Sequence, residues 1–194
     1  MNAKTRSISV NLVLVLTVGL AIAGCGKNGD NEGNNTGKNL TFSESTAEGR
    51  IANMAWKYRS GRANIENDFD GNPIISFKLY SFEFTNPCNA TVDGDFILGS
   101  APNKVGEFYY QPVITPKVDK GTTLTFLTSS DNSLMNLVAD EAKVRIDRIE
   151  CATPGDIATC TKVVGAITGY HDSAKYGNSA ISGTFEIPIC ASPF

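Results

Sequence analysis

The sequence is poor in the side chains and motifs from which most recognisable active sites are built. Its 194 residues include one histidine and one tryptophan. It has no HExxH metal-binding motif, no CxxC pair, no Walker-type phosphate loop and no GxSxG nucleophile turn. We therefore expect no cofactor and no metal ion. Catalysis by a pair of carboxylates stays open, because geometry and not a motif identifies such a pair.

Positive charge is also scarce. The chain has 17 basic and 20 acidic residues, a net charge of −3. Cleavage of residues 1–24 as a signal would take away Lys4 and Arg6 and no acidic residue, and would leave a net charge of −5. Nucleic acids and anionic lipid surfaces are bound through basic faces. No nucleic-acid partner is therefore expected.

The N-terminus has the three parts of an export signal: a basic start, an apolar stretch over residues 8–22, and small residues before Cys25. A transmembrane helix is the alternative. It needs about 20 apolar residues, whereas this stretch is shorter and contains polar residues. The pattern favours a cleaved signal.

Ile22-Ala23-Gly24-Cys25 resembles the lipobox of bacterial lipoproteins, which is an aliphatic residue, two small residues and a cysteine. The resemblance covers only residues 1–25. It implies that the Cys25 sulfur carries a diacylglycerol, that the signal is cleaved before Cys25, and that the new amino group is acylated. With Gly26 in place of aspartate, it also implies sorting to the outer membrane. An ordinary secretory signal with a coincidental cysteine is the alternative.

Residues 26–39 contain no aliphatic or aromatic side chain. Such a segment cannot bury enough apolar surface to fold, and its reach as a flexible coil is about 20 Å. We therefore expect a signal peptide over residues 1–24, a lipidated cysteine and tether over 25–39, and a single β domain over 40–194. The acyl chains would make the membrane one partner of the protein.

Four further cysteines, an even number in an exported chain, predict two disulfides. Cys151 and Cys160 bracket a loop with the turn residues Pro-Gly-Asp, and both flanks have strand patterns. A bridge at the base of this loop is geometrically easy, which leaves Cys88 to pair with Cys190. A zinc site is the alternative, but the cysteine spacing and the single histidine do not favour it.

Short segments of alternating polarity, separated by turn residues, predict an all-β domain. Without the alternating helices of a parallel sheet, about eight strands favour an antiparallel β-sandwich or a small barrel. One short helix is expected over residues 133–142, capped by Asp131 or Ser133. The predicted strands lie within 51–65 and 74–84 and at 96–98, 105–113, 122–128, 143–150, 161–170 and 179–189.

The first two predicted strand segments also predict the position of a turn and of an irregularity. One strand over residues 52–58 is expected to end in a turn at Ser60-Gly61. In the next segment the apolar phase changes by one residue at Leu79-Tyr80, which predicts a β-bulge or a strand that crosses between sheets.

Four aromatic residues are candidates for a ligand-contact surface, because such side chains combine apolar area with a polar group. Alternation places Trp56 and Tyr58 on one face with Met54, which favours burial in the core for both. Tyr109 and Tyr110 point to opposite faces of a strand, so one of them should face water and contact a ligand.

The segment from Asn67 to Pro73 spaces Asp68, Asp70 and Asn72 like the first ligands of a calcium loop. The glycine stands at the fourth position and not the sixth, and the twelfth position lacks the required glutamate. A hairpin turn is the favoured interpretation, with a calcium site as the alternative.

His171-Asp172-Ser173 contains the three side-chain types of a hydrolase triad. Adjacent residues point in different directions, and triads assemble from distant segments. We expect His171 to lie in an exposed turn after a strand that ends at Tyr170.

These features predict a lipid-anchored domain that binds an unknown protein or small-molecule ligand. The first alternative is a hydrolase of envelope polymers that uses carboxylates such as Glu107, Asp119 or Asp172. The second is a lipocalin-like carrier of an apolar ligand.

Overall fold

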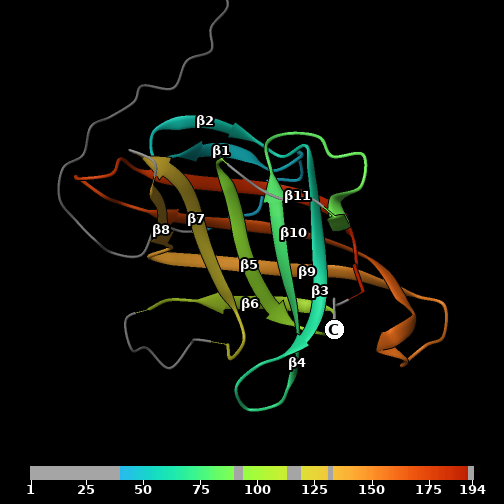
Figure 1. The fold of residues 1–194 in the computed structure, drawn as a ribbon. Helices are drawn as coiled ribbons and strands as arrows, with labels where there is room; N and C mark the ends of the chain where they lie inside the picture. Colours follow the sequence, from blue (N-terminus) through green and yellow to red (C-terminus); the bar gives the residue numbers. More distant parts are fainter. Residues whose placement is uncertain (1–39, 90–93, 113–118, 131–132, 192–194) are drawn as a thin grey trace, which may run out of the picture. The chain divides into compact units, whose positions relative to one another are not determined.

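The structure, a computed structural model, is a β-sandwich of two antiparallel sheets (Figure 1). The predicted signal sequence, Cys25 and the tether lie outside the part of the chain that it describes. The described residues are 40–89, 94–112, 119–130 and 133–191.

The first sheet, sheet A, has six strands in the order β2-β1-β11-β10-β9-β6. Its strands are β1 Glu48–Ile51, β2 Met54–Lys57, β6 Gly106–Tyr110, β9 Glu141–Cys151, β10 Cys160–His171 and β11 Ser179–Pro188. The second sheet, sheet B, has five strands in the order β3-β4-β5-β7-β8. Its strands are β3 Ser60–Asn67, β4 Pro73–Tyr80, β5 Phe96–Pro102, β7 Thr123–Ser130 and β8 Ser133–Val138.

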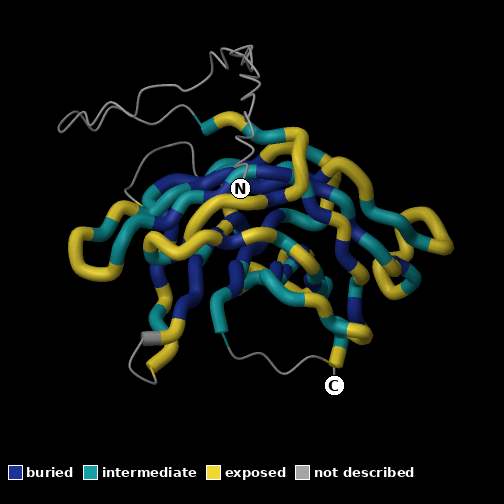
Figure 2. The backbone as a smooth tube through the Cα atoms, turned by 90° about the horizontal axis from the view of Figure 1, so that it is seen from above, coloured by how far each residue is buried: buried dark blue, intermediate teal, exposed yellow. Residues whose placement is uncertain are grey.

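The strands of sheet B run across those of sheet A, as in sandwiches with orthogonal packing (Figure 1). Alternate residues of each strand point into the space between the sheets, where one continuous hydrophobic cluster fills it. Phe77 of β4 stacks on Phe185 of β11, with ring centroids 5.2 Å apart. Figure 2 shows the buried residues along the strands and the exposed ones mainly at the loops. The sandwich predicted from the sequence is confirmed, with eleven strands among the described residues and not eight.

The helix predicted over residues 133–142 is wrong. Ser133–Val138 forms β8, and Glu141 already begins β9. Leu137 is buried opposite Phe126 of β7, whereas Leu134 and Val138 point outward. This alternation has the period of a strand, and pairing with β7 decides the structure of the segment. The described residues contain two short 3-10 helices and no α-helix.

The first hairpin also differs from the prediction. The turn lies at Ala52-Asn53, whose φ angles of 49° and 66° fit a two-residue turn with both central residues left-handed. The Ser179 hydroxyl accepts a hydrogen bond from the Ala52 amide and helps to hold this strained residue. Ser60-Gly61, predicted as a turn, begins β3. The hairpin therefore turns before Trp56 and not after it.

The phase change at Leu79-Tyr80 is not a bulge, because β4 keeps a continuous register with both neighbours up to Tyr80. The strand ends there, and Phe82 and Phe84 fold back over the outer face of sheet B. With Tyr80 and Phe96 they form a second hydrophobic cluster, separate from the main core. The alternation changes phase because the chain changes from filling the core to covering the outer face.

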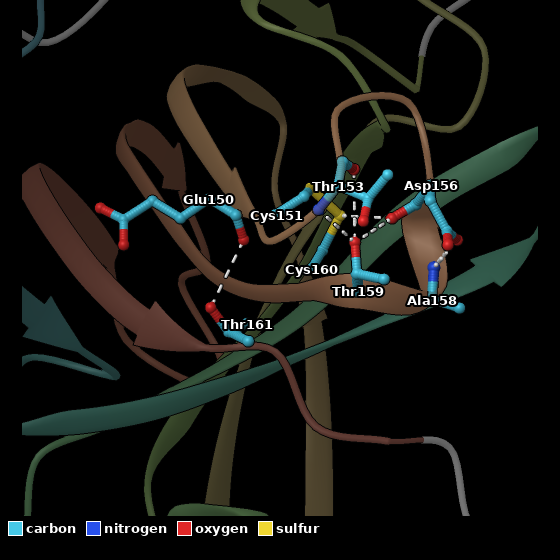
Figure 3. The surroundings of a disulfide bond; sticks show 8 residues. All are labelled: Glu150, Cys151, Thr153, Asp156, Ala158, Thr159, Cys160 and Thr161. Atoms are coloured by element: carbon cyan, nitrogen blue, oxygen red, sulfur yellow. Dashed lines mark hydrogen bonds between the residues drawn. A yellow bond between two sulfur atoms is a disulfide. The ribbon is translucent and has the colours of Figure 1, made fainter.

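Both predicted disulfides are present: Cys88–Cys190 and Cys151–Cys160. The first ties the segment after β4 to the end of β11. The second joins opposite residues of β9 and β10 at the base of the connecting loop (Figure 3). Inside that loop, the Thr159 hydroxyl donates to the Asp156 carbonyl and accepts from the Thr153 amide. The loop is therefore held closed by its own hydrogen bonds as well as by the bridge.

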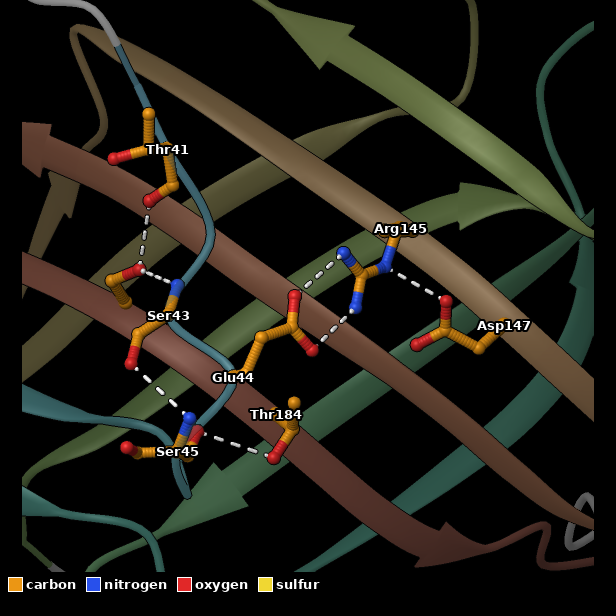
Figure 4. Close-up of polar contacts among 8 residues, drawn as sticks. Thr41, Ser43, Glu44, Ser45, Arg145, Asp147 and Thr184 are labelled. Atoms are coloured by element: carbon orange, nitrogen blue, oxygen red, sulfur yellow. Dashed lines mark hydrogen bonds and ion pairs between the residues drawn. The ribbon is translucent and has the colours of Figure 1, made fainter.

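Residues 40–45, which we call the N-terminal strap, lie across the outer face of sheet A (Figure 4). The Ser43 amide donates to the Ser182 hydroxyl on β11, and Glu44 pairs with Arg145 on β9. The strap therefore crosses β10, which lies between these two strands. This explains why Ala166 and Thr168 of β10 are buried although they lie on the outer face.

Candidate functional site

The β3–β4 hairpin ends in a turn that Asp68 organises. Its carboxylate oxygen Oδ1 accepts hydrogen bonds from the amides of Asp70 and Asn72, at 2.9 and 2.8 Å. These bonds hold the pKa of Asp68 below its usual value, with the Asn72 amide as the largest cause. Gly71 has φ +82°, a left-handed conformation that glycine adopts without strain. The prediction of a hairpin turn at this segment is confirmed.

A surface pocket of about 620 Å³ lies beside this turn. Its volume is typical of small-molecule sites. Ile74, Ser100 and Thr123 come from neighbouring strands of sheet B and lie on its outer face. We call it the hairpin pocket, and it is lined by Glu66, Asn67, Asp68, Phe69, Asp70, Ile74, Ser100, Lys120, Gly121 and Thr123.

Two loops form the sides of the hairpin pocket, and one ion pair joins them. The Lys120 ammonium lies 2.8 Å from Asp70 Oδ2, so the turn before β7 is linked to the tip of the β3–β4 hairpin. The hydrogen bond to Asp70 raises the pKa of Lys120 above its usual value. Both side chains are largely exposed, so the pair adds little stability but fixes where the two charges lie.

Phe69 stands out on the rim of this pocket because its side chain is fully exposed. The neighbouring residues Asp68 and Asp70 are polar, and no strand pattern explains an aromatic ring at a turn. Water contacts the whole ring in the free protein, so covering it with a ligand would remove apolar area from water. Phe69 therefore supplies an apolar surface beside a set of polar groups.

The chemistry of the hairpin pocket selects against anions. Among the described residues, three carboxylates and one ammonium group line it, which gives these groups a net charge of −2. Hydroxyl groups lie on its floor, where the Ser100 and Thr123 oxygens are 2.8 Å apart. Hydroxyl, amide and paired charged groups together suit a ligand rich in hydroxyls, and Phe69 and Ile74 suit an apolar face on the same ligand.

A calcium ion is not favoured at this turn, because Asp68 directs its carboxylate to the amides of its own loop. Among the residues that the structure describes, no group of three or more histidine, cysteine, aspartate or glutamate side chains is arranged to hold a metal ion.

Tyr109 and Tyr110 lie on β6, and neither side chain lines the hairpin pocket. They point to opposite faces of sheet A, as predicted: Tyr110 packs against the core, and Tyr109 lies on the outer face. The Tyr109 hydroxyl donates to the Gln111 side chain, whose amide donates to the buried Glu141. Burial, followed by Glu141, raises the pKa of Tyr109. A ligand-contact role for these tyrosines stays a prediction.

Trp56 is buried, as predicted, and Tyr58 is half-buried with its hydroxyl donating to the Glu186 carbonyl. Met54 lies on the same face of β2 as Trp56, as predicted, but its side chain is 66% exposed. Met54 directly follows the Ala52-Asn53 turn and is the first residue of the edge strand β2.

The side chains of His171, Asp172 and Ser173 do not form a triad. His171 is the last residue of β10, and its Nδ1 lies 3.5 Å from Asp140 Oδ1. The Asp172 amide donates to the same Asp140 carboxylate, and the Ser173 amide donates to Asn178. His171 is therefore part of a strand end that Asp140 holds, and not of the exposed turn that we predicted.

The carboxylates named for a hydrolase have structural partners. Glu107 lies 3.2 Å from the Lys143 ammonium. The Asp119 carboxylate accepts from the Tyr109 amide at 2.8 Å and fixes the chain beside β6. Nothing in these contacts resembles a catalytic acid paired with a base.

Sequence reasoning missed Phe69, Ile74 and Lys120 as parts of one site. The signal for Phe69 was available, because a phenylalanine between two aspartates in a turn has no core to fill. No comparable signal existed for Lys120, which meets Asp70 across 50 positions of the chain.

Comparison with known proteins found no match among protein-family models, curated proteins or solved structures. Within the described part of the chain, no helix has the length and apolar character needed to cross a membrane.

Proposed function

We propose that this protein is an outer-membrane lipoprotein, anchored through Cys25, whose β-sandwich binds an uncharged, hydroxyl-rich ligand such as a glycan in the hairpin pocket. The observation that carries the proposal is the fully exposed Phe69 ring beside a pocket of about 620 Å³ with polar lining. In this proposal the domain binds its ligand and does not transform it.

The ligand class follows from the lining. A sugar ring has an apolar C–H face, which would cover Phe69, and a hydroxyl edge, which would meet Ser100, Thr123 and the Asp70–Lys120 pair. Hydrogen bonds to charged groups are stronger than those between neutral groups. The net charge of the lining disfavours sulfated or phosphorylated glycans, so neutral ones are expected to bind best.

A glycan array tests this proposal with the purified full-length protein. Binding to neutral oligosaccharides is expected, with weaker signals for sulfated forms of the same glycans. Phe69→Ala is expected to lose about tenfold or more in affinity, equal to about 1.4 kcal/mol. Tyr176→Ala, which removes an exposed aromatic ring from a different loop, is the matched control and should leave binding unchanged. Equal loss in both variants, or a preference for sulfated glycans, would contradict the proposal.

The anchor is tested separately, because the ligand pocket and the anchor are independent parts of the proposal. We expect Cys25→Ser to lose acylation and signal cleavage, and to accumulate as the unprocessed form. A mutant that is still processed to residue 25 and partitions into membranes like the wild type would contradict lipid anchoring at Cys25.

A further inference from the structure

The two sheets have four edge strands, and three of them are protected against pairing with another chain. β2 has only four residues and carries Lys57. On β6, the segment at Asp119 bonds to the Tyr109 backbone through both its amide and its carboxylate. On β3, the Cys190 amide donates to the Ala63 carbonyl. Short length, charge and a covering segment are the usual ways in which proteins prevent edge-to-edge association.

The fourth edge, β8, has none of these features in the part of the chain that the structure describes. Its sequence is SLMNLV, without charge and without proline. Leu134 and Val138 are 57% and 44% exposed and lie on the same face of the strand. An apolar, uncharged edge strand of six residues is the kind of edge to which another strand adds.

The hydrogen-bonding pattern shows which backbone groups of β8 are directed to its open edge. The Ala139 amide donates to the Leu124 carbonyl of β7. Because bonding directions alternate along an antiparallel strand, Met135 and Leu137 also bond toward β7. The amide and carbonyl groups of the even-numbered residues, from Leu134 to Val138, therefore point away from the sheet. The residues with exposed side chains are thus also those with outward-directed backbone groups.

We propose that β8 pairs with β8 of a second copy of this chain, antiparallel and around a two-fold axis at Asn136. In this register Asn136 lies opposite its own counterpart, and Leu134 lies opposite Val138 of the second copy, twice by symmetry. The outward backbone groups of each strand then bond to those of the other. The two five-stranded sheets join into one continuous sheet.

A second copy fits this edge better than an unrelated strand, for two reasons. The pattern is self-complementary, because the two apolar residues are equally spaced from Asn136 and meet each other across the axis. The second reason is charge. Two copies of an acidic protein repel each other, but β8 carries no charged side chain, so two copies can meet along this strand without like charges in contact.

The size of the contact sets its strength. One edge strand with two exposed apolar side chains buries less than the roughly 1,200–2,000 Å² of a stable complex. We therefore expect micromolar and not nanomolar dissociation. If the chain is anchored as proposed above, confinement to a membrane raises the effective concentration and favours the dimer.

Charge variants of the full chain in detergent test both the edge and the identity of the partner. Sedimentation velocity is expected to show wild-type dimers that dissociate on dilution. Leu134→Lys with Val138→Lys places like charges opposite each other, and should weaken dimerisation about tenfold or more. Leu134→Lys with Val138→Glu places opposite charges across the axis and should restore it. Met54→Lys, on the edge strand β2, is the control and should dimerise like the wild type.

Three results would overturn the proposal: a wild-type monomer up to about 200 μM, a dimer that the double-lysine variant leaves intact, or no recovery in the lysine–glutamate variant. The last would mean that β8 pairs with a different segment of the second copy, or in a different register, because the purified chain is the only protein present. A second measurement does not depend on the charge variants. Asn136→Cys should form a disulfide-linked dimer under mild oxidation, whereas Ala55→Cys on β2 should not. The absence of a specific Asn136→Cys dimer would also overturn the proposal.

Discussion

Removal of the two disulfides one at a time is expected to destabilise the domain unequally. Constraint of the unfolded chain grows with the length of the closed loop, and the two bridges span 102 and 9 positions. In the chain-entropy model these lengths correspond to about 4.7 and about 2.7 kcal/mol. The shorter loop is also held by Thr159, whose hydrogen bonds survive when the bridge is removed. The native loop should therefore keep its conformation when the short bridge is removed.

The test compares two double variants. In one, both Cys88 and Cys190 are replaced by alanine; in the other, both Cys151 and Cys160 are. Replacing both members of a bridge leaves no unpaired partner thiol. For a domain of this size each kcal/mol lowers the melting temperature by about 2–4 °C. We expect a decrease of about 9–19 °C for the long bridge and somewhat more than half as much for the short one. Calorimetry of the purified, oxidised proteins measures both. An equal loss, or a larger loss for the short bridge, would refute the entropic reasoning.

Three further perturbations test the core, the strap and the pH dependence. Phe77→Ala removes a fully buried ring and should cost about 3–5 kcal/mol in urea unfolding; a cost below about 1 kcal/mol would mean that the core collapses around the gap. Glu44→Ala breaks the pair with Arg145 and should cost less than about 1 kcal/mol, because the pair is partly exposed. Hydrogen exchange of the strap amides should nevertheless accelerate, and unchanged exchange would show that the pair does not hold the strap. Burial raises the pKa of Tyr58 to about 12 from 10.0, so its contribution to stability is present below pH 10.0 and is lost as the pH rises toward 12. The Tyr58→Phe variant should lose less stability above pH 10.0 than the wild type. An identical dependence of stability on pH in the two proteins would contradict this prediction.

Strand patterns were visible in the sequence wherever alternation was clear and local. The segment at 179–189 alternates over its whole length and forms β11, and the turn residues at 67–73 form the β3–β4 hairpin. The helix prediction over residues 133–142 was wrong for a physical reason. A capping residue before a short apolar run resembles a helix start, and only pairing with β7 shows that the run belongs to a sheet.

The candidate site was less predictable than the fold, because it is assembled from segments far apart in the chain. The hairpin turn was predicted, but Ser100, Lys120 and Thr123 reach it only through the strand order of sheet B. Sequence patterns fix which face of a strand is buried, but they do not fix which strands become neighbours. The disulfide pairing was predictable because one pair bracketed a local turn and left a single choice for the other.

The most direct measurement of the central claim is an NMR titration of the isotope-labelled protein with the neutral oligosaccharide that binds most strongly on the array. We expect the largest chemical-shift changes at Phe69, Ile74, Ser100, Lys120 and Thr123, with small changes at Tyr176. Shifts that concentrate on the outer face of sheet A, or no saturable shifts with any array glycan, would contradict a binding site in the hairpin pocket.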